Sequence, residues 1–258
     1  MASVSVASAR QFVALAEIPS IPRTREVAAS PTVDLVFDAA KSQAAVVGSD
    51  IVSFVKGVSA ERREAIVNSS MLAQLVAKKK VPDSTRLVEW YDAYFDVLTN
   101  IGWVIQDKGF AEYREEAQNF EAHKAILAVA GTLLGAAPTA LALIKVTLEA
   151  LQSMNEDSPW ITLFNRESQS ARTARFQVSL AEENPDGEFI VTLMAFGLEA
   201  TSTITQVLFF KAKANEATLR HASGRVTINT AVLDGVGDQI KSKLVANARD
   251  FVKTLPDL

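Results

Sequence analysis

Apolar side chains recur at three- and four-residue steps through most of the first 160 residues, the spacing of amphipathic helices. Between residues 32 and 56 this pattern continues over several turns, and Ser30 stands before it as an N-cap. The same spacing predicts a second helix after Ser59 and a third over residues 84–107. The second helix is expected to end at the lysines 78–80, whose charge interacts favourably with a helix C-terminus.

The pattern stays helical further along the chain and then stops. The charged residues 112–124 indicate a solvent-exposed helix that leads into an apolar segment, with helical spacing to about residue 154. Residues 165–174 are polar and aperiodic, which indicates a linker or long loop.

After residue 174 the period changes to two. Phe176 and Val178 alternate with Gln177 and Ser179, and residues 184–187 (Asn-Pro-Asp-Gly) predict a hairpin turn. Strands are expected on either side of this turn and further along the chain, at residues 188–198, 203–213 and 217–228. The last of these has more polar residues, as in an edge strand, and a closing amphipathic helix follows it to Leu255.

These elements predict an α+β fold: an N-terminal helical bundle, then an antiparallel four-stranded β-meander and a C-terminal amphipathic helix. Residues 1–164 are the mainly helical region, with a central apolar helix or helical hairpin at 125–151. Residues 165–258 hold the β-meander and the last helix. The pattern leaves open whether the two regions share one core.

Composition removes several classes of function. The net charge of −4 argues against a nucleic-acid surface, because binding a phosphate backbone needs clustered Lys and Arg. The absence of cysteine removes thiol nucleophiles, disulfides and zinc-thiolate sites. The N-terminal residues lack the basic start and apolar core of a secretory signal peptide. The expected location is therefore the cytoplasm, or the outside after export by a dedicated system without a Sec signal peptide.

No constellation of catalytic residues is evident in the sequence. His123 and His221 have no neighbours that complete a metal site or a triad. Gly235 and Gly237 lack the third glycine of a dinucleotide loop, because residue 240 is isoleucine. We therefore expect a protein that is not an enzyme and that has no cofactor or metal.

The segment that poses a functional question is residues 125–144, twenty residues without a titratable side chain. A single helix of this length is roughly 30 Å long, the thickness of the hydrocarbon core of a bilayer. Gly131 and Gly135 form a GxxxG spacing, which allows close helix contacts in membranes. Pro138 would kink such a span or mark the turn of a shorter hairpin. The candidate membrane-contact residues are Ile126, Leu127, Gly131, Leu133, Leu134, Gly135, Leu141 and Ile144.

The high alanine content favours a different interpretation, in which this segment is a buried helix wrapped by the helices at 32–56 and 84–107. An Ala/Gly-rich apolar segment inside a helical half, followed by a small β-region, is similar in pattern to helical pore-forming toxins. That resemblance implies a membrane-active protein, a toxin or injected virulence effector that exposes 125–151 to lipid and oligomerises there. The alternatives are a non-enzymatic scaffold that binds a protein partner, and a carrier of an apolar ligand.

Overall fold

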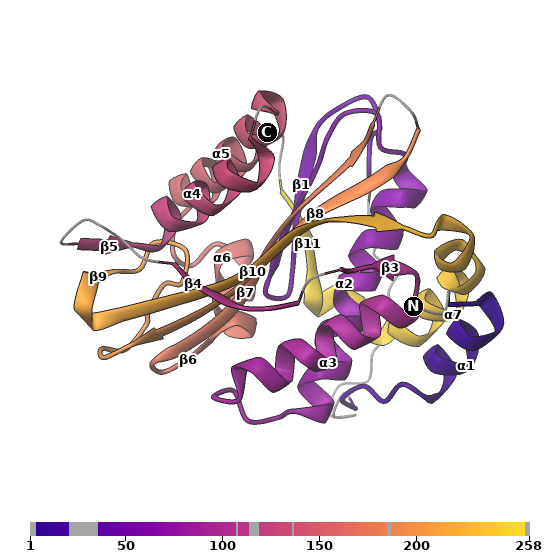
Figure 1. Cartoon of the computed structure of the whole chain (residues 1–258), viewed down its shortest axis with the longest axis horizontal. Helices are drawn as coiled ribbons and strands as arrows, with labels where there is room; N and C mark the ends of the chain where they lie inside the picture. Colours follow the sequence, from indigo (N-terminus) through magenta and orange to yellow (C-terminus); the bar gives the residue numbers. More distant parts are fainter. Residues whose placement is uncertain are drawn as a thin grey trace.

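The computed structural model describes residues 4–20, 36–106, 108–113, 119–135, 137–184 and 187–255, apart from the side chains of residues 246 and 248–250. These residues form three layers, with a large mixed sheet in the middle and helices on both of its faces (Figure 1). The α+β class is confirmed. The order and arrangement of the elements differ from the sequence prediction.

The central sheet combines strands from distant parts of the chain. Its order is β11 (Val252–Thr254), β1 (Gln43–Val47), β2 (Asp50–Phe54), β7 (Thr173–Glu183), β8 (Phe189–Ala200), β10 (Ala217–Ile228) and β3 (Trp103–Val104). Neighbours are antiparallel except β2 and β7, which are parallel. Two short strands extend it, β4 (Ala111–Tyr113) on β10 and β6 (Gln169–Ser170) on β7. Separately, β5 (Asn119–Glu121) pairs with β9 (Lys211–Lys213).

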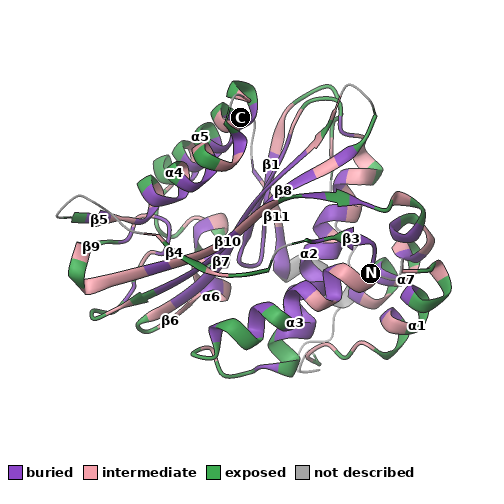
Figure 2. Ribbon diagram, in the orientation of Figure 1, coloured by how far each residue is buried: buried purple, intermediate pink, exposed green. Residues whose placement is uncertain are grey.

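Seven α-helices lie in the described part of the chain, divided between the two faces of the sheet. One face carries α1 (Val6–Leu15), α2 (Ala60–Lys80), α3 (Leu87–Asn100) and α7 (Thr230–Phe251). The other carries α4 (Ala122–Leu134), α5 (Pro138–Ser153) and α6 (Pro159–Ser168). Figure 2 shows buried residues along the strands and the inward sides of these helices, and exposed residues on their outward sides.

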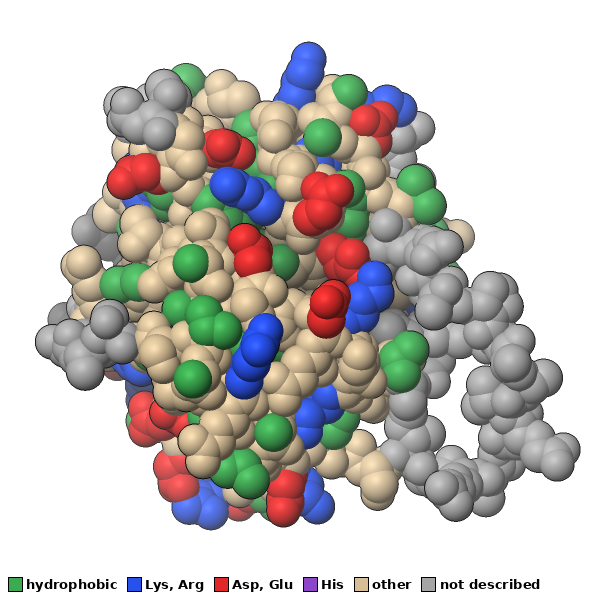
Figure 3. All heavy atoms as spheres, turned by 90° about the vertical axis from the view of Figure 1, so that its right-hand side faces the viewer, with side chains coloured by type: hydrophobic (Ala, Val, Ile, Leu, Met, Phe, Trp, Pro, Cys, Tyr) green, Lys and Arg blue, Asp and Glu red, His purple; other side chains and the backbone are tan. Residues whose placement is uncertain are grey.

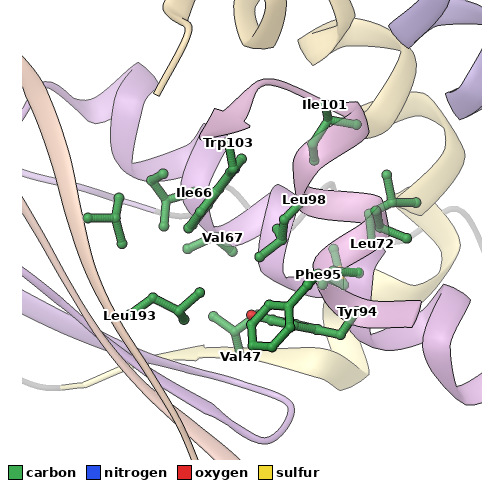
Figure 4. Close-up of a cluster of buried hydrophobic side chains, with 14 of the residues drawn as sticks. Val47, Ile66, Val67, Leu72, Tyr94, Phe95, Leu98, Ile101, Trp103 and Leu193 are labelled. Carbon is green, nitrogen blue, oxygen red and sulfur yellow. The ribbon is translucent and has the colours of Figure 1, made fainter. Parts of the chain in front are cut away.

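Two hydrophobic cores result, because successive side chains of a strand point to opposite faces. We call the core under α1, α2, α3 and α7 the first core, and that under α4, α5 and α6 the second core. In β8, for example, Leu193 belongs to the first core and Met194 to the second. Figure 4 shows side chains of α2 and α3, among them Ile66 and Leu98, directed toward Leu193 of the sheet.

Several predicted elements are confirmed. Ser59 caps α2 by accepting a hydrogen bond from the backbone N–H of Arg62 (3.3 Å), and the lysines 78–80 occupy its last turn. The turn between β7 and β8 is closed by a hydrogen bond from the Gly187 N–H to the Asn184 carbonyl (2.9 Å), while residues 185 and 186 of the predicted turn lie outside the described residues. The C-terminal helix is α7, which packs on one face of the sheet as expected.

The helix predicted at 32–56 is wrong over residues 43–54, which form the hairpin of β1 and β2. Both strands are buried on both faces, so their apolar residues run almost continuously, and such a run fits a helical period as well as a strand. Gly48 makes the two-residue turn with φ of +56°, a conformation that favours glycine. Ser30, the predicted cap, lies outside the described residues.

Four other predictions are wrong. The third helix ends at Asn100 rather than 107, because Gly102 turns the chain (φ +106°) into β3. The expected helix over 112–124 holds parts of β4 and β5 before α4 begins; residues 114–118 lie outside the described residues. The expected linker at 165–174 is the end of α6, β6 and the start of β7. The expected strand at 203–213 is a loop that ends in the short β9.

These corrections replace the helical bundle and four-stranded meander. Strands β1 and β2 precede most of the helices and are hydrogen-bonded in the same sheet as β7, β8 and β10. Residues from both halves of the chain therefore build each core.

Candidate membrane-contact site

Helices α4 and α5 form an antiparallel hairpin over the second core (Figure 1). Gly135 ends α4 with φ of +50°, and Pro138 stands at the first position of α5, where its missing N–H costs nothing. The apolar segment 125–144 is thus divided between two helices. Within the described residues, no helix is both long and apolar enough to cross a bilayer.

The structure brings the eight candidate membrane-contact residues together in this hairpin, at different depths. Ile126 and Ile144 are fully buried in the second core, and Leu134 is 5 % exposed. The half-buried candidates are Leu127, Gly131, Leu133 and Leu141. Gly135 is exposed at the turn. A Cβ on Gly131 would lie 4.0 Å from Leu141, and a Cβ on Gly135 would meet no described atom within 4 Å, so the GxxxG spacing does not mark a close approach of α4 and α5.

The cover over these residues differs from the one expected. The expected wrapping segments are β1 and β2 of the sheet and, on the opposite face, α3 in the first core. The hairpin instead lies on the second-core face of the sheet, where α4 contacts β10 and α5 contacts β2, and α6 covers β1 and β7 on the same face. Release of the hairpin therefore means separation from the sheet rather than movement of covering helices.

Polar contacts between the hairpin and the rest of the molecule are few. Thr147 of α5 donates to its own helix at the Leu143 carbonyl (2.8 Å) and contacts the Ser53 hydroxyl of β2 (3.1 Å). Among the described residues, the Ser53–Thr147 contact is the one side-chain hydrogen bond between residues 125–153 and the sheet. Neither residue stood out in the sequence; the available signal was a hydroxyl within an otherwise apolar strand or helix.

The beginning of α4 is anchored by charge. Glu121 forms ion pairs with Lys124 (2.6 Å) and with Lys211 of β9 (3.3 Å), and the hydrogen bond from Lys124 is the main reason that the pKa of Glu121 is lowered. The backbone N–H of Ala122 donates to the Phe210 carbonyl (3.0 Å). The hairpin is therefore held by polar groups where it starts and by apolar packing toward its turn.

The charge distribution follows the same division. Residues 125–144 carry no charge on either the inner or the outer side, and exposed positions there are small, such as Ala128, Thr132 and Ala142. The charged residues Lys124, Lys145 and Glu149 lie further from the turn. We call residues 125–144 the uncharged tip.

The surface hollows and charged groups elsewhere on the described residues are weaker candidates for a functional site than the hairpin. Two surface hollows of about 260 Å³ each lie between Leu151, Ile161 and Phe209, and between Arg86, Phe110 and Arg220. Both are smaller than the usual 300–1,000 Å³ of ligand pockets. No three His, Asp or Glu side chains of the described residues gather closely enough to hold a metal ion. On the side of the molecule that carries α1 and α7, acidic and basic side chains are interspersed (Figure 3).

No protein-family model matches the chain, and no curated protein matches its sequence. Solved structures that resemble it include the following two. A delta-endotoxin has a TM-score of 0.42 and 17 % identity, over 84 % of this chain and 96 % of that one. The Evf virulence factor has a TM-score of 0.40 and 12 % identity, over 86 % and 94 %. Both TM-scores are below 0.5, and the function proposed below rests on the geometry of the hairpin.

Proposed function

We propose that this chain is a non-enzymatic, membrane-active protein, a toxin or injected effector, whose α4–α5 hairpin leaves the sheet and enters lipid. The observation that carries the proposal is the combination of an uncharged tip with an inner face attached almost entirely by apolar contacts. Such a face loses little when it exchanges protein for lipid, because hydrocarbon is as apolar as the second core.

The lengths of the helices set the depth of insertion. With a rise of 1.5 Å per residue, α4 is about 20 Å long and α5 about 24 Å, against roughly 30 Å for a hydrocarbon core. The ten uncharged residues of α4 that precede Gly135 cover about 15 Å, half of that thickness. We therefore propose that the tip enters one leaflet, with Lys124, Lys145 and Glu149 at the headgroups.

Displacement also uncovers the sheet face that the hairpin protected. The strands that the hairpin contacts, β2 and β10, contribute Ile51 and Leu219 to the second core, and each is 1 % exposed in the folded protein. Leaving such a surface in water costs about 25 cal/mol per Å². Contact with the bilayer, or with a second copy of the chain on the membrane, removes that cost, so assembly on the membrane belongs to the proposal.

A reversible covalent tether tests the proposal. The hydroxyls of Ser53 and Thr147 are 3.1 Å apart, so the double variant Ser53→Cys/Thr147→Cys places two thiols where a disulfide is geometrically possible. The natural chain has no cysteine, so these are the sole thiols. The measurement is dye release from vesicles of several lipid compositions, before and after oxidation, with each single-cysteine variant as a control.

We expect the reduced double variant and both single variants to release dye, and the oxidised double variant to release none until a reductant is added. Equal release from the oxidised and reduced forms would show that the hairpin stays on the sheet. Absence of release by the wild type across all compositions would contradict the membrane function itself, and would favour the scaffold interpretation.

A further inference from the structure

Among the described residues, a single carboxyl group is buried in the first core, on the face of the sheet opposite the hairpin. Asp50 begins β2 directly after the Gly48–Ser49 turn and is 1 % exposed. Its oxygens accept hydrogen bonds from the Ser70 hydroxyl of α2 (2.7 Å) and the Ser179 hydroxyl of β7 (3.0 Å). One side chain therefore joins two strands of the sheet to α2.

Uncharged side chains extend this hydrogen-bond network. The Gln74 amide of α2 donates to the Ser70 hydroxyl (3.0 Å) and to the Val47 carbonyl of β1 (2.8 Å). On β7, the Gln177 amide donates to the Tyr91 hydroxyl of α3 (3.0 Å). The Ser49 hydroxyl lies within hydrogen-bond distance of the side-chain oxygens of Gln74 (3.0 Å) and Gln177 (3.1 Å), so both helices of the α2–α3 pair are bonded to the sheet through one buried network.

The titratable groups that face Asp50 from α3 are two tyrosines. Burial raises the pKa of Tyr91 and of Tyr94 above the usual range, and the charge of Asp50 raises that of Tyr94 further. Tyr94 extends from α3 toward the sheet (Figure 4), and interaction of its buried hydroxyl with the Ser70 side chain acts to lower its pKa, against the larger effect of burial. Both phenols therefore stay neutral wherever Asp50 titrates.

No cation is hydrogen-bonded to Asp50 among the described residues. On α2, Arg63 donates to the Val58 carbonyl (2.8 Å) and the Gln43 side chain (2.8 Å). On β7, Arg175 lies 4.6 Å from the ring of Trp90. From β8, apolar residues lie opposite Ser179 and Gln177. Burial without a cation raises the pKa of Asp50 to about 7, although the two serine hydroxyls act to lower it.

We propose that Asp50 is a pH-sensitive lock, which holds the α2–α3 layer on the sheet when protonated and loosens it when ionised. The folded chain binds the proton more tightly than the unfolded chain, in which the carboxyl has its ordinary pKa of 3.8. The stability that Asp50 contributes is therefore fully present below about pH 4 and is lost as the pH rises from about 4 to about 7. The lock acts on the face opposite α4–α5, so it is independent of the proposed membrane function.

The first test is urea unfolding between pH 5 and pH 8, followed by the fluorescence of Trp90 and Trp103, which are both buried in the first core. A pKa of about 7 against 3.8 predicts that the unfolding equilibrium constant of the wild type rises about 100-fold over this range through Asp50. Asp50→Asn should lose that dependence. Asp92→Asn, which neutralises an exposed acid on α3, should keep it.

A second measurement on the wild type does not depend on how well the variant folds. Carbon-13 NMR of labelled aspartate should show one carboxyl that titrates near pH 7 and is absent from Asp50→Asn. In Ser179→Ala that midpoint should move upward, because a donor to the charged form is lost; a purely structural role of the serine would leave it unchanged. An Asp50 carboxyl that titrates below pH 5, or a variant with the pH dependence of the wild type, would overturn the proposal.

Discussion

A carboxylate near the turn of the α4–α5 hairpin should weaken membrane binding while leaving the folded protein intact. Ala142 is exposed on α5, four residues after Pro138 and therefore about 6 Å along the helix. In the folded protein, Ala142→Asp meets solvent, so its cost is limited to helix propensity, at most about 0.7 kcal/mol. In the proposed membrane-bound form the same carboxylate lies deep in a leaflet.

The expected size of the effect follows from that depth. An aspartate at the centre of a membrane helix costs about 3 kcal/mol, which corresponds to roughly 150-fold weaker binding. Val146 is one turn further from the tip, beside Lys145 and near the proposed headgroup level. Charges near the interface cost about 0–1 kcal/mol, so Val146→Asp should weaken binding by about fivefold at most.

The assay is co-sedimentation with vesicles, paired with dye release and with urea unfolding of each variant. Val245→Asp is the matched control, because Val245 is a 59 % exposed valine on α7 in the opposite layer. We expect wild-type binding by Val245→Asp, a small loss for Val146→Asp and a large loss for Ala142→Asp. Equal binding by all three variants, or equal loss in all three, would refute insertion by the tip.

Three further substitutions test the packing of the two cores by urea unfolding. Leu134→Asp puts an unpaired charge into the second core and should lower the free energy of unfolding by about 3 kcal/mol or more; a variant as stable as wild type would contradict that burial. Tyr91→Phe removes the hydroxyl that accepts a hydrogen bond from Gln177 and should lower the free energy of unfolding by about 1–3 kcal/mol. An unchanged urea midpoint would contradict this expectation. Gly197→Ala makes a Cβ overlap Leu87 and should cost about 1–3 kcal/mol; Leu87→Ala in that background should recover part of the loss, and no recovery would place the strain elsewhere.

The sequence was sufficient where local chemistry decides the structure. Ser59 and the lysines 78–80 mark both ends of α2, because a cap and a charged last turn act within one element. The β7–β8 hairpin follows from alternation before a turn motif and an apolar run after it. In the site, Pro138 left two possibilities, a kinked single span or the turn of a hairpin, and the hairpin is the form found.

Other features of the fold depend on burial by segments that are distant in the sequence, and local sequence patterns do not reveal that burial. Gln177 and Ser179 alternate with apolar residues, as on a solvated sheet face, yet they are buried because α2 and α3 cover that face. Strands β1 and β2 are covered on both faces. Their sequences therefore lack the regular alternation of apolar and polar residues that identifies a strand. Asp50 lies in such a strand, and its partners Ser70 and Ser179 come from segments far along the chain.

The central claim is that the hairpin separates from the sheet on a membrane, and a distance between spin labels tests it most directly. The cysteine-free chain allows specific labels at Ala142→Cys on α5 and Val245→Cys on α7, in opposite layers. A reference pair, Val88→Cys and Val245→Cys, lies within the layer of the first core. At pH 6, vesicles should change the α5–α7 distance distribution and leave the reference distribution unchanged. Binding to vesicles with both distributions unchanged would contradict the account.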